Sequence, residues 1–129
     1  MRLTLNGVTE NRKCFLNTIA NGRRLAGGFT LTPKAMADDG LLDLCLADPL
    51  SLPMRLRELA AVMNGTHLKD SVFHYYQVPG LTVEFDTEVP AHLDGELIFD
   101  SRFQIDVVAK GLRVIINPRG EHYFLRPAP

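Results

Sequence analysis

The sequence holds few of the residues that cross-link small domains or mark specialised binding surfaces. It has two cysteines, Cys14 and Cys45, without a CxxC spacing, which argues against a disulfide framework or a zinc ribbon. Each cysteine lies in an apolar run, so we expect two buried free thiols. The four histidines are scattered without the spacing of metal ligands. Tryptophan is absent, and this absence counts against a carbohydrate-binding domain.

An excess of charge of one sign is also missing. The chain has 14 Lys and Arg residues against 15 Asp and Glu residues, without a basic block, so no nucleic-acid partner is expected. No apolar run approaches the roughly 20 residues of a membrane-spanning helix. The N-terminal residues 1–13 lack the apolar core of a signal peptide. We therefore expect a cytoplasmic protein with a single domain, residues 1–129.

Short apolar runs bounded by Gly, Pro, Asn or Asp dominate the chain. They have the length and composition of β-strands, and the dipeptides Asn6-Gly7 and Asn21-Gly22 are typical of tight turns. So many short strands at close spacing predict a mainly β fold, an antiparallel two-sheet β-sandwich. The strand-like runs are residues 2–8, 13–22, 27–33, 41–47, 71–78, 80–86, 96–100, 102–109 and 112–118, and the C-terminal residues 120–129 suggest a last strand or strap.

One α-helix is predicted, over about residues 52–64. Ser51 is placed to cap it, Pro53 falls in its first turn, and Asn64-Gly65 supplies a stop. Apolar residues recur at helical spacing, namely Met54 or Leu56, then Leu59, Ala60 and Met63. Core filling is the favoured role for the methionines, and lining an adaptable apolar pocket is the alternative.

Two stretches contain residues that suggest a function beyond the fold itself. The first is a loop that begins with Pro33 and has the sequence PKAMADDG. Asp38 and Asp39 precede Gly40 and two leucines. A carboxylate in a tight loop whose carbonyls turn inward suits a hard cation such as Mg²⁺, which takes oxygen ligands and keeps several waters. An Asp-Gly turn that leads into a buried strand explains the residues about as well.

The second stretch is AHLDGEL, residues 91–97, in which Asp94 and Glu96 lie on either side of Gly95. If the backbone is extended there, the two carboxylates share one side, and each raises the pKa of the other. A carboxylate with a raised pKa suits a general base that accepts a hydroxyl proton near neutral pH. The alternative is a type I′ turn followed by a solvent-facing glutamate, which composition alone favours.

The order and spacing of these motifs resemble one family. The pattern runs from NG through GG, P-x-A-x-x-DDGLLD, the helix and G-x-H-L-K (residues 65–69) to DGE. It is similar to the C-terminal domain of the bacterial diacylglycerol kinase and sphingosine kinase-like lipid kinases, from about Ile19 to Asn117. The resemblance implies a β-sandwich that carries the lipid-acceptor side of an active site, with peripheral contact at the inner face of the membrane and oligomerisation left open.

The resemblance also implies roles for particular residues. Glu96 matches the proton acceptor, and Asp94 matches the aspartate that works beside it. Asp39 matches a carboxylate ligand of a structural Mg²⁺, with the backbone carbonyls of Met36 and Leu41 as further ligands. A lipid kinase also needs an apolar cavity for its acceptor, a lipid alcohol such as a diacylglycerol or a sphingoid base. We expect this cavity between the sheets or under the helix, extending toward the DGE hairpin. The candidates for lining it, chosen from periodicity, are Met54, Met63, Phe73, Tyr75 and Phe99.

The family's ATP-binding half has no counterpart in this sequence. The chain contains neither the family's GGDGT phosphate loop nor a P-loop or GxGxxG motif. We therefore expect ATP to be bound mainly by an N-terminal nucleotide-binding domain of the same protein, and the 129-residue chain to be inactive alone. The alternative function is a non-catalytic β-sandwich that binds a lipid or a protein.

Overall fold

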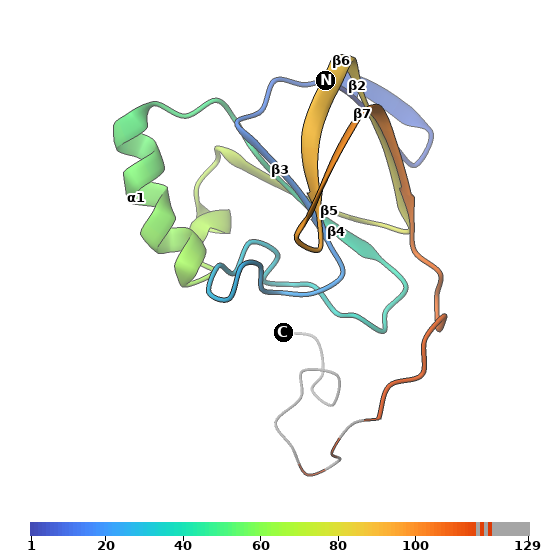
Figure 1. Ribbon diagram of the computed structural model, residues 1–129. Helices are drawn as coiled ribbons and strands as arrows, with labels where there is room; N and C mark the ends of the chain where they lie inside the picture. Colours follow the sequence, from blue (N-terminus) through green and yellow to red (C-terminus); the bar gives the residue numbers. More distant parts are fainter. Residues whose placement is uncertain (116, 118, 120–129) are drawn as a thin grey trace.

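The chain folds into two antiparallel sheets and one α-helix (Figure 1). The computed structural model describes residues 1–115, 117 and 119. In chain order the elements are β1 (Arg2–Leu5), β2 (Val8–Asn11), β3 (Leu16–Ala20), β4 (Leu42–Ala47), α1 (Leu52–Met63), the 3₁₀ turn η1 (His67–Lys69), β5 (Phe73–Val78), β6 (Gly80–Leu93) and β7 (Glu96–Asp106). The sheets have the strand orders β2-β1-β6-β7 and β3-β4-β5. The predicted two-sheet sandwich with one principal helix is confirmed.

Aliphatic side chains from both sheets form the larger core. Strand β4 supplies alternate leucines, because successive side chains of a strand point to opposite faces. Leucines and valines from β1, β5 and β6 pack against them. The buried members of this inner cluster are Leu3, Leu42, Leu44, Leu46, Val78, Leu81 and Val83.

A second cluster covers the opposite face of the three-stranded sheet. Here the alternate residues Cys45 and Ala47 of β4 pack against α1 and against the connection between β3 and β4. The helix contributes Val62, and the connection contributes Leu31. The molecule is therefore layered as sheet, sheet, and a helix-and-loop cover. The buried members of this outer cluster are Leu31, Cys45, Ala47, Leu50, Val62 and Phe73.

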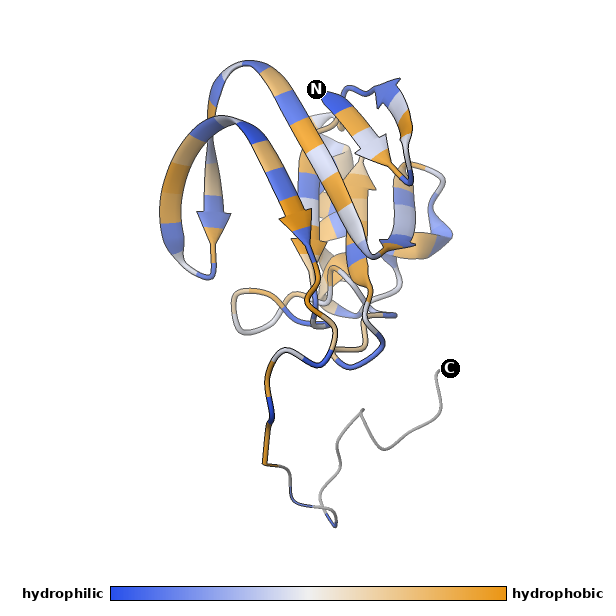
Figure 2. Cartoon of the chain, turned by 90° about the vertical axis from the view of Figure 1, so that its right-hand side faces the viewer, coloured by the Kyte–Doolittle hydropathy of each residue, from blue (hydrophilic) through white to orange (hydrophobic). Residues whose placement is uncertain are grey.

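The hairpin of β6 and β7 is the longest element of the fold. Its strands span 14 and 11 residues, and Figure 2 shows them curving away from the rest of the molecule. The pairing register shifts between Glu84 and Val89, so the outer half of the hairpin is offset from the inner half. Such an irregularity bends a strand and strengthens its twist. The outer half, residues 89–100, therefore forms an arm that ends in the Asp94-Gly95 turn.

Some predicted strands are wrong in their details. Residues 27–33 are a loop with a single bridge between Leu25 and Phe29, because Ala26 and Gly27 have φ angles of 49° and 76° that turn the chain back. Residues 96–100 and 102–109 form one strand, β7, up to Asp106. Residues 112–115 lie outside any strand, and the predicted strap at 120–129 lies outside the described residues. Strand β2 was not predicted, since VTEN has little apolar content.

The helix has the predicted position, but the role favoured for its methionines fails for Met63. Val62 and Glu58 are the buried side chains of α1, whereas Leu56, Leu59 and Met63 are exposed. The prediction that Met63 fills the core is therefore wrong, and Met54 is half-buried against the outer cluster. Ser51 is the N-cap residue without a side-chain hydrogen bond. Within the described residues, no helix is both long and apolar enough to cross a membrane.

Candidate functional site

The Asp94-Gly95 turn lies at the tip of the β6–β7 arm. Asp94 and Gly95 have φ angles of 49° and 98°, which is the geometry of a type I′ hairpin turn, and Leu93 pairs with Glu96 across it. The backbone is thus not extended at Asp94, so the condition under which the two side chains would share one side is not met. Both residues are exposed, and neither carboxylate has a hydrogen-bond or ion-pair partner in the part of the chain that the structure describes.

The arm below this turn presents apolar side chains to solvent. Leu97 and Phe99 alternate along β7 and are 53% and 61% exposed. Phe103 and Phe85 continue the apolar pattern toward the body of the sheet, where their rings meet edge to face. Phe99, a predicted substrate-binding residue, therefore lies on the same arm as Asp94 and Glu96.

The loop with the predicted cation ligands is closed by its own hydrogen bonds. The Asp39 carboxylate accepts a hydrogen bond from the Leu41 amide at 2.9 Å, and the Asp39 amide donates to the Met36 carbonyl at 3.5 Å. Gly40 has a φ of 76° that completes the turn. Among residues 1–115, 117 and 119 no group of three or more His, Cys, Asp or Glu side chains is arranged to hold a metal. The loop therefore has the hydrogen bonds of an Asp-Gly turn that leads into β4, and its role in binding Mg²⁺ stays a prediction.

A buried polar network lies behind this loop, and it was not predicted. Asp43 of β4 is fully buried, and its Oδ1 accepts hydrogen bonds from the Tyr75 hydroxyl and the Gln77 amide of β5. Its Oδ2 has no partner among the described residues. Burial raises the pKa of Asp43 despite the hydrogen bonds from Tyr75 and Gln77, and burial likewise raises the pKa of Tyr75. The available signal was an aspartate inside the apolar run LLDLCL.

The same face holds a buried cysteine and histidine that lack the character of a catalytic pair. Cys45 Sγ lies 3.6 Å from His67 Nε2, which is also 3.2 Å from the Leu31 carbonyl. A carbonyl oxygen can only accept a hydrogen bond, so we assign the ring proton to Nε2. A protonated Nε2 cannot take a proton from the Cys45 thiol. Burial raises the pKa of Cys45 to about 11 and lowers that of His67. A neutral thiol beside a neutral imidazole is a packing arrangement, as expected for Cys45.

The predicted substrate-binding residues do not come together in one site. Phe73 is a buried member of the outer cluster, and Met54 and Tyr75 pack against the same cluster. Met63 is exposed at the end of α1, and Phe99 lies on the arm of the other sheet. The five residues therefore mark at least three places in the fold.

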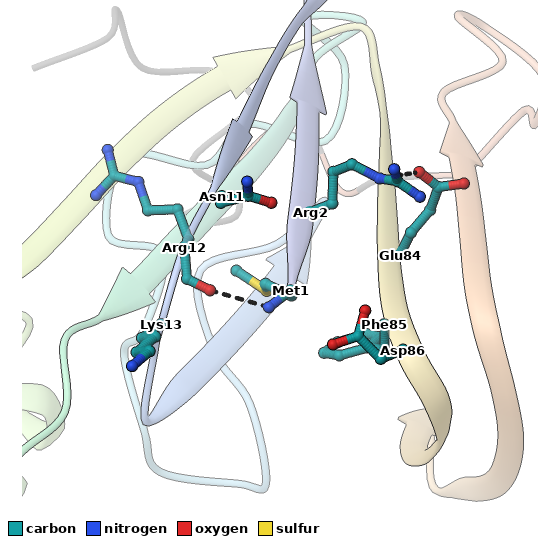
Figure 3. A pocket seen from close by; sticks show the side chains of 8 residues that line it. All are labelled: Met1, Arg2, Asn11, Arg12, Lys13, Glu84, Phe85 and Asp86. Atoms are coloured by element: carbon teal, nitrogen blue, oxygen red, sulfur yellow. Dashed lines mark hydrogen bonds and ion pairs between the residues drawn. The ribbon is translucent and has the colours of Figure 1, made fainter.

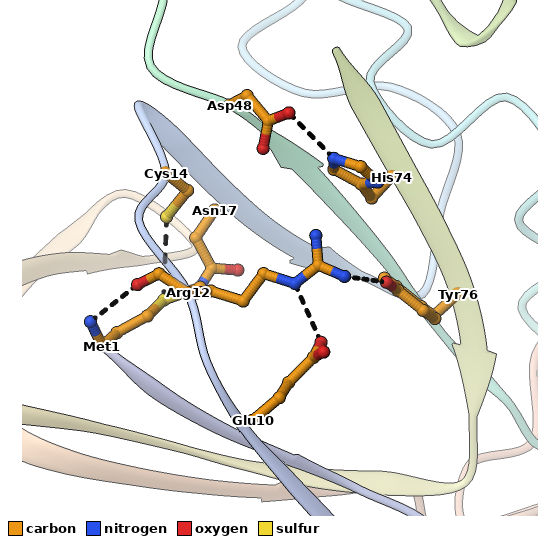
Figure 4. Close-up of polar contacts among 8 residues, drawn as sticks. All are labelled: Met1, Glu10, Arg12, Cys14, Asn17, Asp48, His74 and Tyr76. Atoms are coloured by element: carbon orange, nitrogen blue, oxygen red, sulfur yellow. Dashed lines mark hydrogen bonds and ion pairs between the residues drawn. The ribbon is translucent and has the colours of Figure 1, made fainter. Parts of the chain in front are cut away.

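An open hollow of about 350 Å³ lies elsewhere, between the first strands and β6 (Figure 3). Arg2 donates to Glu84 there at 2.9 Å. Arg12 closes one side of it and reaches across to the other sheet, with Nη2 donating to the Tyr76 hydroxyl at 2.8 Å and Nε to Glu10 at 2.9 Å (Figure 4). The hollow is charged and contains none of the predicted site residues. It is lined by Met1, Arg2, Asn11, Arg12, Lys13, Glu84, Phe85 and Asp86.

Comparison with known proteins places this layered sandwich in a class. Residues 1–116 match the family described as the YegS C-terminal NAD kinase beta sandwich-like domain. Because the match covers most of the sequence, the chain belongs to this family.

Several relatives are described as probable lipid kinases of the YegS-like type. One from Shewanella frigidimarina is 29% identical over 119 residues, which are 90% of this chain and 37% of that protein. One from Pseudomonas aeruginosa is 34% identical over 110 residues, which are 84% of this chain and 35% of that protein. The crystal structure of a candidate diacylglycerol kinase from Bacillus anthracis superposes with a TM-score of 0.66 at 19% identity, over 83% of this chain and 35% of that one. This chain thus spans little more than a third of the length of its relatives.

Proposed function

We propose that this chain is the lipid-acceptor domain of an ATP-dependent lipid kinase, and that it presents the hydroxyl of a lipid alcohol for phosphorylation. The proposal rests on one observation: the acids of the DGE motif stand exposed, without partners among the described residues, at the tip of the arm. A domain built only to bind has no need of two such acids. The family relationship, in which relatives are described as lipid kinases, supports this interpretation.

In the proposed reaction, Glu96 accepts the proton of the lipid hydroxyl. The hydroxyl oxygen forms a bond to the γ-phosphorus of ATP, the bond from that phosphorus to the bridging oxygen breaks, and ADP leaves. Asp94 lies two residues away in the turn and orients the alcohol. Phe99, on the same arm, offers apolar surface for an acyl chain beside the acids. The nucleotide is held by the part of a longer kinase that lies outside this domain.

The 36–41 loop is proposed as a weak structural Mg²⁺ site. The Asp39 carboxylate and the carbonyls of Met36 and Leu41 would hold the ion, whose charge would stiffen the loop that leads into β4. If so, Mg²⁺ raises the melting temperature of the chain, and Asp39→Asn abolishes that increase whereas Asp38→Asn does not. Equal responses of both variants to Mg²⁺ would refute the site.

A chimera tests the catalytic proposal. The chain replaces the matching region of the Shewanella frigidimarina relative, and the product is assayed with ATP and a panel of lipid alcohols. We expect the chimera to phosphorylate at least one lipid, and the 129-residue chain alone to phosphorylate none. Because general-base help contributes about 10²–10⁴-fold, Glu96→Gln should lower kcat by that factor.

The KM for the lipid should change little, since the loss falls on the transition state. Glu88→Gln is the matched control, because Glu88 is an exposed glutamate of the same hairpin. If the chimera is active and its Glu96→Gln variant keeps a near-normal kcat, Glu96 is not the general base. It is then a solvated residue that follows a turn. A chimera that binds lipid but never transfers phosphate would favour the non-catalytic alternative.

A further inference from the structure

The outward face of α1 is apolar and lies open to solvent. Four large side chains recur along it at positions i, i+4, i+7 and i+11, which places them on one stripe of the helix. Leu56 and Leu59 in its middle are 67% and 47% exposed. We call this surface the α1 outer face, and it consists of Leu52, Leu56, Leu59 and Met63. Because these four side chains form one continuous stripe rather than scattered single residues, the face is a candidate for contact with another apolar surface.

One cation, Arg55, is the charge beside the α1 outer face that no carboxylate of the described residues neutralises. Glu58, the single acid of the helix, is buried on the opposite side and paired with Arg57, which also bonds Asp70. Arg55 borders the stripe with its guanidinium 4.1 Å from the centre of the Phe15 ring. Its Nε donates to the Leu50 carbonyl at 2.9 Å, and it has no carboxylate partner within the described residues, so its terminal nitrogens can meet an anion. Phe15 is itself 47% exposed and extends the apolar surface. The outward side of α1 thus combines apolar groups with positive charge and carries no carboxylate.

This combination suits an anionic lipid surface better than a second copy of the chain. A 12-residue helix is about 18 Å long and about 10 Å wide, so two such faces cover only a few hundred Å². A stable protein interface needs about 1,200 Å² or more. A helix that lies in a membrane interface needs only an apolar stripe sunk among the acyl chains and cations near the phosphates.

We propose that the α1 outer face docks the domain on an anionic bilayer, with Leu52, Leu56, Leu59 and Met63 inserted below the headgroups and Arg55 at the phosphates. The proposal rests on the proposed function, because a kinase whose acceptor is a lipid meets that acceptor at a membrane. It adds the surface through which the domain reaches its substrate.

A tryptophan reporter tests the insertion, since the natural chain has no tryptophan. Leu56→Trp places the reporter on the α1 outer face, and Leu112→Trp places it at a matched leucine that is 82% exposed far from α1 in the sequence. With vesicles of equimolar phosphatidylcholine and phosphatidylglycerol, the Leu56→Trp emission should shift to the blue and resist an aqueous quencher. The Leu112→Trp emission should do neither. Equal behaviour of the two reporters would overturn the proposal.

Vesicle flotation then measures the contribution of each group. Leu56→Asp combined with Leu59→Asp should weaken binding at least about tenfold, because each leucine contributes its transfer free energy. Leu112→Asp combined with Val114→Asp is the control and should bind like the natural chain. Arg55→Gln should weaken binding to the phosphatidylglycerol vesicles by roughly fivefold and leave binding to pure phosphatidylcholine unchanged. Circular dichroism first checks that each variant has the secondary structure of the natural chain. We expect that it does, because exposed positions tolerate substitution.

Two other occupants of this face would overturn the proposal. A dimer in sedimentation equilibrium that Leu56→Asp converts to monomer would identify a second copy. A Leu56→Trp reporter that is already shielded in the Shewanella chimera without vesicles would show that the rest of the kinase covers the face. The vesicle experiments contain no ATP, so they are independent of catalysis. A chain that binds vesicles but yields an inactive chimera contradicts the proposed function alone, and an active chimera without vesicle binding contradicts the docking surface alone.

Discussion

The two faces of the three-stranded sheet are made from alternate residues of the same strands, yet their chemistry differs. The inner face of β4 carries Leu42, Leu44 and Leu46, which pack on an all-aliphatic cluster between the sheets. The outer face carries Asp43 and Cys45 among buried polar groups that lack some of their hydrogen-bond partners. Dispersion and the hydrophobic effect act without direction on the inner face, whereas the outer face depends on particular hydrogen bonds. The inner face therefore depends on apolar burial alone. The outer face adds particular hydrogen bonds to its apolar cluster and holds the loop of the proposed Mg²⁺ site and the helix of the proposed docking surface.

The largest expected effect on stability comes from a substitution in the inner cluster. Leu44→Ala removes a fully buried side chain between the sheets and should lower the free energy of unfolding by about 2–5 kcal/mol. Leu56→Ala, at an exposed leucine of α1, should change it by no more than about 0.5 kcal/mol. Urea unfolding followed by circular dichroism gives both values. Similar losses for the two variants would show that the inner cluster is not the main source of stability.

Two neighbouring tyrosines of β5 sharpen the comparison, because they lie on opposite faces. Tyr75 donates to the buried Asp43 carboxylate, whereas Tyr76 accepts from Arg12, which Glu10 also holds. Tyr75→Phe should cost about 1.5–3 kcal/mol, since it removes a hydrogen bond to a buried carboxylate. Tyr76→Phe should cost about 0.5–1.5 kcal/mol, since Arg12 keeps its other partner.

Chemical denaturation at neutral pH measures the two tyrosine variants. A double-mutant cycle with Asp43→Asn isolates the pair, because the loss caused by Tyr75→Phe should shrink when the carboxylate is gone. A larger loss of unfolding free energy for Tyr76→Phe than for Tyr75→Phe would contradict the view that the outer face is the one that depends on particular hydrogen bonds.

This contrast also explains which features could be predicted from the sequence. The alternation of leucines and the Asn-Gly and Asp-Gly dipeptides predicted the sandwich, the hairpin turn and the positions of most strands along the chain, because both signals are local. The helix was predicted in place, but its methionines were both assigned to the core although Met63 is exposed, because periodicity locates a stripe without saying what covers it. The loop at 27–33 looked like a strand by composition, although the positive φ angles at Ala26 and Gly27 decide its shape.

The site was predicted less completely than the fold. Asp94 and Glu96 were singled out, and the structure adds that they stand at the tip of a long arm. Their catalytic role stays a prediction, as does the Mg²⁺ role of Asp39. The Asp43 network was missed because its partners, Tyr75 and Gln77, lie more than thirty residues away in the sequence. The five apolar candidates were chosen by spacing within single elements, which carries no information about which elements meet.

The smallest expected effect is a pH dependence that arises on the outer face. Burial lowers the pKa of His67, and the Leu31 carbonyl and Glu58 offset this only in part. In the unfolded chain a histidine has a pKa of about 6.5. Between that value and the lower folded value the unfolded state binds more protons, so the free energy of unfolding should fall as the pH falls through this window. This loss of stability is absent above the pKa that His67 has in the unfolded chain, and it is complete below the pKa that His67 has in the folded chain.

His67→Gln should therefore remove a slope of at most about 1.4 kcal/mol per pH unit from the stability profile below about pH 6.5. Stability is compared as a slope because the variant also loses imidazole packing, including the edge contact with Phe73 at 4.7 Å between ring centroids. His92→Gln, at an exposed position of the arm, is the matched control for a histidine-to-glutamine change. NMR titration of the His67 ring in the natural chain gives the folded value directly. A His67 that titrates at or above about 6.5, or equal slopes for the two variants, would show that burying this imidazole does not link folding to protonation.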